Sequence, residues 1–390
     1  MRLHTMEFEL IDRIRARAAT RGDVVLGIGD DAALLSMPPG MQLVVAMDTL
    51  NDGVHFPQGT AAADIGHKAL AVNLSDLAAM GATPAWCTLS LSLPAADMDW
   101  VDAFLDGFLA LADAHGIALV GGDTTRGPLS VCVAVHGFVE PGLALRRDGA
   151  RVGDDVWGSG TLGDAAAGLV LALGDDRVAM SDIAERDELP TLESRRDGWV
   201  EPGRSTENAE ATASEPTRHV PPHSGGQGTA RPSPQPLSRG ERGFDPSHVT
   251  WLRARLDRPT PRIALGRALG GVATACIDIS DGLLADTAHI ARASGVGLRI
   301  DVGALPASPA LRGVARDANA LRTWQSAGGD DYELCFTAPR DARKRVEASA
   351  QAAGVAVTRI GQAVAGAGVE AIDARGHAWR AMRAGYRHFD

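Results

Sequence analysis

Aspartates that follow short apolar runs, with glycine beside them, are the feature of this sequence that most constrains its fold. The run 43–47 is followed directly by Asp48, and the run 117–120 leads into Gly-Gly-Asp-Thr-Thr-Arg-Gly at 121–127. Six clusters of this kind occur along the chain, at 29–31, 47–49, 73–76, 122–124, 278–282 and 329–331. Strand ends in an α/β fold converge on one crevice, where ligands bind. The sequence therefore predicts an α/β fold with carboxylates gathered in one cleft.

Strand-like and helix-like segments alternate along the chain, which is typical of α/β architecture. The expected helices are 61–80, 100–115, 164–173, 262–269 and 281–294, and the expected strands are 43–47, 86–93, 117–120, 131–139, 155–157, 274–279, 296–302, 331–337 and 355–360. A chain of 390 residues exceeds what one core usually supports. We therefore expect two domains, 1–150 and 151–390.

One segment, 184–248, differs in composition from the rest. Residues 200–248 contain eight of the 21 prolines and few large apolar side chains. Burial of so few apolar groups does not offset the entropy of ordering the backbone. The composition predicts a disordered insertion within the second domain.

The net charge of −11 argues against a sequence-independent nucleic-acid binder, which needs a basic surface. No apolar run approaches the roughly 18 residues of a membrane span, and the first residues lack the pattern of a signal peptide. We expect a soluble cytoplasmic protein with no nucleic-acid or membrane partner.

The repeated carboxylates require a compensating cation. Two carboxylates about 4 Å apart repel by roughly 4 kcal/mol at an effective dielectric constant of 20. Mg²⁺ prefers such oxygen ligands and leaves positions open for phosphate, and Arg126, Arg146 and Arg147 offer forked hydrogen bonds to a polyphosphate. Any single aspartate is also a common turn or N-cap residue, and Asp281 fits both interpretations.

A different class of site is suggested by Gly158-Ser-Gly-Thr-Leu-Gly163, which matches G-x-G-x-x-G between a strand and a helix. The dinucleotide fingerprint also needs a second strand that ends in an acid about 20 residues later. The chain there runs into the predicted insertion. A tight strand-to-helix turn is therefore the favoured interpretation, and a dinucleotide oxidoreductase is the alternative.

Six long motifs, taken together and in order, resemble the thiamine-monophosphate kinase family of the aminoimidazole ribonucleotide synthetase-like superfamily. They are Gly-Ile-Gly-Asp-Asp-Ala-Ala-Leu at 27–34, Met-Asp-Thr-Leu at 47–50 with His-Phe at 55–56, Lys-Ala-Leu-Ala-Val-Asn-Leu-Ser-Asp-Leu-Ala-Ala-Met-Gly-Ala at 68–82, Gly-Gly-Asp-Thr-Thr-Arg-Gly at 121–127, Ile-Asp-Ile-Ser-Asp-Gly-Leu at 277–283 and Gly-Gly-Asp-Asp-Tyr-Glu-Leu at 328–334. The resemblance covers nearly the whole chain except the insertion.

The resemblance implies a two-domain fold, a homodimer that pairs its N-terminal sheets, and direct transfer of a phosphoryl group from ATP to thiamine monophosphate with several Mg²⁺ ions. The implied metal ligands are Asp31, Ala46, Met47, Asp48, Asp76, Asp123, Asp278 and Asp281, with Asp30 in support. Of these, Asp123, Asp278 and Asp281 are the implied catalytic residues. ATP is expected at Gly122, Asp123, Arg147 and Ser280, and thiamine phosphate at His55, Asp330 and Arg383.

Three positions depart from the family pattern. Ala46-Met47 replaces Ser-Thr, so only main-chain oxygens remain there for a metal; Asp330 replaces Glu; and Arg383 stands where an aromatic residue is usual, with Trp379 or Tyr386 as candidates for its role. Two further alternatives are another ATP-using enzyme of the superfamily and a non-catalytic metal-binding protein.

Overall fold

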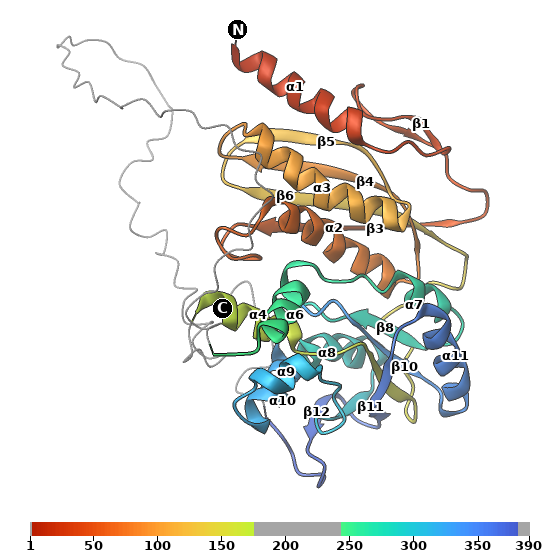
Figure 1. Ribbon diagram of the computed structural model, residues 1–390. Coiled ribbons are helices and arrows are strands. Elements are labelled where there is room, and N and C mark those ends of the chain that lie inside the picture. The colour runs from red at the N-terminus through yellow and green to blue at the C-terminus, as the bar shows by residue number, and fades with distance from the viewer. Residues whose placement is uncertain (1, 175–242, 381–390) are drawn as a thin grey trace, which may run out of the picture.

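The computed structural model describes residues 2–174 and 243–380, which form two sheets, each with its own helices (Figure 1). The predicted mixture of helices and strands is confirmed in both halves of the chain. The N-terminal half begins with α1 (Arg2–Arg17), β1 (Val24–Leu26) and β2 (Leu34–Leu35). The two short strands pair with each other, outside the main sheets.

The first main sheet has four strands in the order β3-β6-β4-β5. Their bounds are β3 (Gln42–Asn51), β4 (Thr83–Leu93), β5 (Ala118–Arg126) and β6 (Ser130–Val139). Only β4 and β5 run parallel; the other pairs are antiparallel. In β6, Val131, Val133 and Val135 are fully buried while the alternate residues are half-buried. The sheet therefore buries one face, which α2 (Ala62–Ala79) and α3 (Met98–His115) cover (Figure 1).

Helix α2 is closely packed on two sides. A Cβ atom added at Gly107 of α3 would lie 1.8 Å from the backbone oxygen of Ala63. One added at Gly266 of α7 (Ile263–Ala268) would lie 1.9 Å from the backbone oxygen of Ala78. Only glycine, which lacks Cβ, permits approaches this close. Since α3 belongs to the first half of the chain and α7 to the second, α2 is fixed between them.

The second sheet has six strands in the order β12-β9-β11-β7-β10-β8. Its strands are β7 (Asp155–Ser159), β8 (Ala275–Asp278), β9 (Gly297–Asp301), β10 (Leu334–Ala338), β11 (Val357–Val364) and β12 (Gly368–Ile372). Only β12 and β9 pair in parallel.

The other helices of this half are α4 (Asp164–Leu173), α6 (Pro246–Asp257), α8 (Leu283–Ser294), α9 (Pro309–Val314), α10 (Ala318–Ala327) and α11 (Arg343–Ala353), with a short 3-10 turn at Arg340–Ala342. None of the helices in the described part of the chain is long and apolar enough to span a bilayer.

A single apolar core joins the two halves. It contains Leu77 of α2 and Val133 of β6 together with Leu265 of α7 and Phe336 of β10, all fully buried. Burial of apolar side chains from both sheets in one cluster holds their relative orientation.

Three expectations from the sequence need correction. The predicted strand 117–120 is too short, because residues 121–126 also belong to β5 and pair with β4 as far as Arg126. Helix α6 begins at Pro246, so the last residues of the predicted insertion, 184–248, are helical; residues 175–242 lie outside the described part. Most strand pairs are antiparallel, so neighbouring strands do not all end at one edge.

Candidate functional site

The strand β8 ends at a buried carboxylate that contacts the first half of the chain. Asp278 is 5% exposed, and its Oδ2 accepts a hydrogen bond of 2.8 Å from the Ser75 hydroxyl of α2. The next residue of α2 is Asp76, whose pKa is raised in part by the charge of Asp278. Two of the predicted metal ligands thus lie together where the two sheets meet.

A third predicted ligand, Asp48, is held beside this pair by an asparagine. The backbone N–H of Asp48 in β3 donates to Asn73 Oδ1 at 2.9 Å, and the Asn73 amide donates to Ala69 O within α2. Asn73 is fully buried. This contact joins the edge strand β3 to α2, and the charge of Asp48 raises the pKa of both Asp76 and Asp278.

The turn that follows β8 carries Ser280 and Asp281, and a carboxylate that sequence reasoning missed organises it. Asp286 Oδ2 accepts the backbone N–H groups of Ser280, Asp281 and Gly282, each at 3.1 Å. The N-cap residue of α8 is Gly282, and Asp281 precedes it. Asp286 is in the first turn of α8, which begins at Leu283, two residues later than the predicted helix.

Burial and mutual repulsion disturb the ionisation of the group formed by Asp48, Asp76, Asp278, Asp281 and Asp286, here called the acidic cluster. Burial first, and then the charges of Asp278 and Asp48, raise the pKa of Asp76 to about 8. Burial also raises the pKa of Asp278 to about 6, against the hydrogen bond from Ser75. For Asp286, burial and then the charges of Asp278 and Asp281 raise the pKa to about 8. These carboxylates are therefore poised to take up a cation.

A cavity of about 480 Å³ opens beside the acidic cluster. Val44, Val45 and Ala46 of β3 form an apolar side, Arg147 a basic one, and Asp76 also lines it. The charge of Arg147 lowers the pKa of Asp76 and of Asp278. Apolar strand residues, a guanidinium and carboxylates on one cavity suit the base, the phosphates and the metal of a nucleotide.

The donor set fits Mg²⁺ in one particular way. Within residues 2–174 and 243–380, no three carboxylate, imidazole or thiol groups converge into a ready-made metal cage. Mg²⁺ is usually held by one or two carboxylates together with water and substrate phosphates. The acidic cluster offers carboxylates of that kind, so water and phosphate oxygens would have to complete the coordination of an ion held there.

Met47 adjoins Asp48 in β3, but the predicted metal and nucleotide residue Asp123 lies apart from the acidic cluster. In β5, Asp123 is opposite Ser90, which is opposite Cys132, which is opposite Thr49 of β3. Three strand spacings separate β5 from β3, roughly 14 Å. Asp48 is opposite Val133, whose side chain is buried under the helices, so Asp48 points to the helix-covered face of the sheet. Asp123 is in the row of Ser90, one residue further along the strands, and therefore points to the other face.

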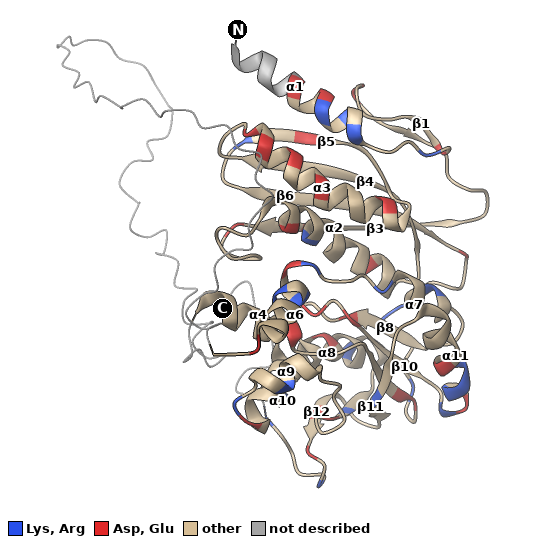
Figure 2. Ribbon diagram, in the orientation of Figure 1, with Lys and Arg blue, Asp and Glu red and all other residues tan. Residues whose placement is uncertain are grey.

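Asp30 and Asp31 lie on the same side of the sheet as Asp123, whereas Gly122 is in the row of Leu89, Val133 and Asp48. Asp30 and Asp31 are exposed in the loop between β1 and β2, and this hairpin packs through Val24 and Leu35 against buried residues of β4 and β5. Gly122 neighbours Asp123 in β5. Figure 2 shows acidic positions both on β5 and, across the first sheet, at the end of β8. The expected single crevice is thus two separate groups within one chain.

The predicted substrate residues His55 and Asp330 meet at a lysine. Lys68 Nζ of α2 donates to the backbone oxygen of His55 at 2.9 Å and forms an ion pair of 3.3 Å with Asp330 Oδ2. The His55 ring accepts the Asn51 N–H through Nδ1 at 3.0 Å. Sequence reasoning did not single out Lys68, and Arg383 lies outside the described residues.

The turn that carries Asp330 is tied to the acidic cluster. The backbone N–H of Asp330 donates to Ser280 O at 2.8 Å, and that of Tyr332 donates to Ile279 O at 2.8 Å. Within the turn, the Tyr332 hydroxyl donates to Asp330 Oδ1 at 3.0 Å. Burial, Asp330, Asp48 and Asp278 all raise the pKa of Tyr332. The substrate residues therefore adjoin the carboxylates.

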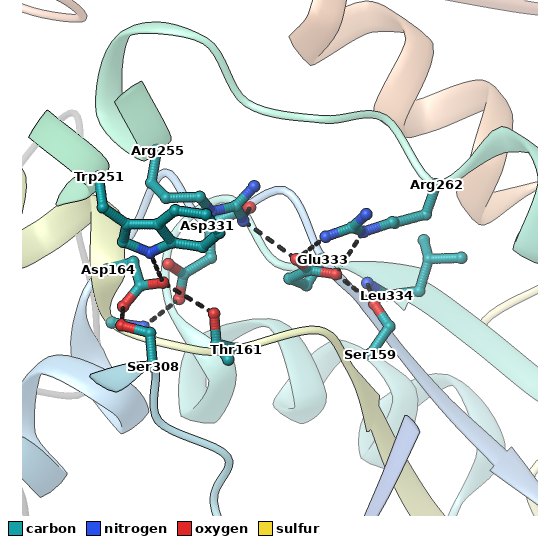
Figure 3. A network of polar contacts seen from close by, with 11 residues as sticks. Ser159, Thr161, Asp164, Trp251, Arg255, Arg262, Ser308, Asp331, Glu333 and Leu334 are labelled. Atoms are coloured by element: carbon teal, nitrogen blue, oxygen red, sulfur yellow. Dashed lines mark hydrogen bonds and ion pairs between the residues drawn. The ribbon is translucent and has the colours of Figure 1, made fainter. Parts of the chain in front are cut away.

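Behind this turn, a buried polar network connects elements of the second half of the chain (Figure 3). Glu333 has no exposed surface and forms ion pairs with Arg255 and Arg262; its Oε2 also accepts the Ser159 hydroxyl. Arg255 donates in addition to the backbone oxygen of Asp331 at 3.0 Å. The network links β7, α6 and the residues that precede β10.

In the glycine turn 158–163, which suggested a dinucleotide site, the protein's own carboxylates occupy the space beside the backbone. A Cβ at Gly160 would overlap the Glu333 carboxylate, and the Gly163 N–H donates to Asp331 Oδ2 at 2.7 Å. A dinucleotide fingerprint keeps this helix N-terminus for the pyrophosphate. Since a buried carboxylate occupies that position here, the structural interpretation of the turn is confirmed and the dinucleotide interpretation is wrong.

We expect the free energy of unfolding of the metal-free protein to fall as the pH rises from about 4 to about 8. Asp76 and Asp278 have folded-state pKa values of about 8 and about 6, above the ordinary aspartate value of 3.8. In that window the folded state retains protons that the unfolded state has lost, so stability decreases with pH. Urea denaturation in EDTA measures the slope. The slope should be smaller in Asp76→Asn, and Mg²⁺ should stabilise the wild type more at pH 8 than at pH 5; equal slopes in the two proteins would contradict this account.

Comparison with known proteins shows the same two-part organisation. The family model AIR synthase related protein, N-terminal domain, matches residues 29–139, and AIR synthase related protein, C-terminal domain, matches residues 245–374. The thiamine-monophosphate kinase of Salmonella typhimurium is 40% identical over 360 residues, which cover 91% of this chain and 90% of that protein.

Solved structures agree with these matches. The crystal structure of thiamine-monophosphate kinase from Stenotrophomonas maltophilia is 47% identical, with a TM-score of 0.73, and the alignment covers 96% of this chain and 98% of that one. The structure of AaThiL complexed with AMPPCP and TMP is 27% identical, with a TM-score of 0.66 over 98% of this chain and 97% of that one.

Proposed function

The chain belongs to the thiamine-monophosphate kinase family, given its identity and coverage with curated members, and from this premise we propose that it phosphorylates thiamine monophosphate with ATP. The product is thiamine diphosphate, and ADP is released. The observation that carries the proposal is the acidic cluster beside a cavity with an arginine wall, directly next to the Lys68, His55 and Asp330 contacts. The related AaThiL structure, complexed with AMPPCP and TMP, supports the two substrates.

We propose that the acidic cluster holds Mg²⁺ and does no acid–base chemistry. A phosphate monoester has a second pKa near 6, so an oxygen of the thiamine phosphate is already a nucleophile at neutral pH. It attacks the γ-phosphorus in line; the new P–O bond forms as the bond to the β,γ-bridging oxygen breaks, and ADP leaves. Bound Mg²⁺ would neutralise charge on the transferring group. Asp48, Asp76, Asp278 and Asp281 would hold the ions, and Arg147 would bind the phosphates.

The product assay separates this function from its rivals. Purified protein is incubated with ATP, Mg²⁺ and thiamine monophosphate, and nucleotides and thiamine esters are resolved by chromatography. We expect equal amounts of ADP and thiamine diphosphate, and none of either without thiamine monophosphate. Another ATP-using enzyme of the superfamily would form no diphosphate, and a non-catalytic metal-binding protein would release no ADP.

The separation of Asp123 and Asp31 from the acidic cluster favours the homodimer that the resemblance implies. We propose that residues 1–150 form the dimerisation domain and that these carboxylates take part in metal binding at a dimer interface. The support is the outer face of the edge strand β3, where Leu43, Val45 and Met47 are exposed together. A contiguous apolar face of this kind usually marks a protein interface.

Replacing Val45 by Asp is expected to convert the dimer to a monomer, because the substitution places a charge in the proposed interface. The oligomeric state is the readout, since Val45 also lines the cavity and its replacement can lower kcat directly. Val152→Asp is the matched control, since Val152 is 60% and Val45 58% exposed and Val152 is outside the sheet. Analytical ultracentrifugation gives the oligomeric state. A monomeric wild-type protein, or a Val45→Asp variant that stays dimeric, would contradict the interface. Cytoplasmic location stays a prediction.

A further inference from the structure

Lys68 is a buried cation whose contacts belong to the proposed substrate side. Its side chain is 3% exposed, and its ammonium group contacts His55 O and Asp330 Oδ2. We propose that Lys68 is a positioning residue that sets the affinity for thiamine monophosphate by fixing Asp330 and the His55 loop relative to each other. This inference rests on the proposed function.

The neighbours of Lys68 on its own helix are apolar and buried. On α2 it lies among Ile65, Ala69, Leu70 and Val72, all at most 2% exposed. A lysine is rarely buried in such a helix unless it is paired, because desolvation of the ammonium group is costly. The helix therefore retains a charged residue at this place for its partners, which come from the loop after β3 and from the turn before β10.

Lys68 acts through Asp330 rather than on a ligand. The Asp330 side chain is 30% exposed, while that of Lys68 is almost completely covered. Lys68 holds one carboxylate oxygen at 3.3 Å, and the Tyr332 hydroxyl holds the other at 3.0 Å. With both oxygens fixed, Asp330 presents its carboxylate to solvent in one orientation.

The backbone of this turn makes the fixation necessary. Asp330 and Tyr332 are the described non-glycine residues with positive φ, at 66° and 48°. Such conformations cost energy and persist only when the surroundings hold them. The ion pair to Lys68 is one such constraint, and it reaches across from the other half of the chain.

The same contact joins the loop of His55. Its backbone oxygen accepts the lysine proton at 2.9 Å, and its ring is held by Asn51. One ammonium group thus links a loop of the first domain to a turn of the second. The charge of Lys68 also lowers the pKa of Asp257, the last residue of α6. The positive charge of Lys68 is therefore balanced in part by a third element.

The test uses Lys68→Met and Lys68→Arg in the full-length protein. We expect Lys68→Met to raise the KM for thiamine monophosphate by about tenfold or more, the typical loss for a charged hydrogen bond, with the KM for ATP within about twofold of the wild type. Lys68→Arg, which retains the charge, should restore part of the affinity. Calorimetric Kd values for thiamine monophosphate, measured with an ATP analogue present, should change in parallel.

A matched control separates positioning of the site from general attachment of the domains. Arg258 forms an ion pair with Asp64 of α2, so it also crosses between the two halves, but it lies outside the proposed site. Arg258→Met should leave both KM values unchanged. The double variant Lys68→Met/Asp330→Asn should have nearly the affinity of Asp330→Asn alone, because interacting residues are not additive.

Unchanged KM and Kd for thiamine monophosphate in Lys68→Met would overturn the inference, as would additive effects in the double variant or equal increases in both KM values. If Lys68→Met does not fold, the same comparison is made with Lys68→Arg, for which the expected increase is smaller but selective for thiamine monophosphate. A wild-type protein that forms no thiamine diphosphate would instead refute the proposed function.

Discussion

The variant Asp278→Asn is expected to lose at least about a thousandfold in kcat while remaining folded. Asp278 is the most central member of the acidic cluster: it contacts Ser75, and its charge affects the pKa values of both Asp76 and Asp286. Loss of one preorganised electrostatic contact to a transition state typically costs a hundred- to a thousandfold. Here the removed group would also hold the metal that carries that stabilisation. Steady-state ADP formation with saturating ATP and thiamine monophosphate measures the effect.

The free energy of unfolding of Asp278→Asn should not fall with its kcat. An asparagine retains an oxygen to accept the Ser75 proton, and it removes one of the buried charges whose repulsion raises the pKa of Asp76. At pH 7.5 without metal, we therefore expect a free energy of unfolding equal to that of the wild type or higher by up to about 2 kcal/mol. Asp113→Asn, an exposed carboxylate of α3, is the control and should alter neither quantity. Near-normal kcat in Asp278→Asn would show that the acidic cluster is not the catalytic metal site.

The substitution Glu333→Gln should reduce the free energy of unfolding by about 3–5 kcal/mol. Glu333 is fully buried and pairs with two guanidinium groups, Arg255 and Arg262, whose side chains are 8% and 17% exposed. Removal of one partner from a buried ion pair leaves an uncompensated charge, which is the costly case. Here one substitution leaves two such charges (Figure 3). Urea denaturation followed by circular dichroism gives the value.

A surface pair provides the control for this measurement. Arg299 and Glu370 form an ion pair with side chains 50% and 52% exposed. The same chemical change at that site, Glu370→Gln, should cost less than about 0.5 kcal/mol, because exposed pairs contribute little. If the two substitutions had similar effects, the buried network would not be a determinant of stability.

The sequence predicted elements best where one periodicity acted without competition. The expected helix 164–173 coincides with α4, and 61–80 differs from α2 by one residue at each end. The predicted strand 117–120 ended too early, because Gly121-Gly122 interrupts the apolar run and glycine weakens a strand pattern. In the fold, Gly122 has a φ of 148° and packs against Leu89 of β4, so tertiary pairing overrides the local signal.

The candidate site was predicted in part. Asp48, Asp76, Asp278 and Asp281 are brought together, whereas Asp123 is not, because alternation along the strands of the first sheet assigns Asp48 and Asp123 to opposite faces. Asp31 is in the loop between β1 and β2, on the side of Asp123. No local pattern reports which face of a sheet a strand residue will share with a residue three strands away. Lys68 and Asp286 escaped notice for a related reason: their partners, Asp330 and the Ser280 turn, are defined only by tertiary contacts.

The placement of α2 between two glycines has a bearing on how such a protein can be recombined. Gly107 and Gly266 let α3 and α7 touch the backbone of α2, the helix that presents Lys68, Asn73, Ser75 and Asp76. In a hybrid enzyme made from the N-terminal half of one relative and the C-terminal half of another, α2 and α3 come from one protein and α7 from the other. A methyl group at position 266 would displace α2 and with it the four site side chains that α2 carries. A hybrid is therefore expected to function only if the α7 of one parent fits against the α2 of the other.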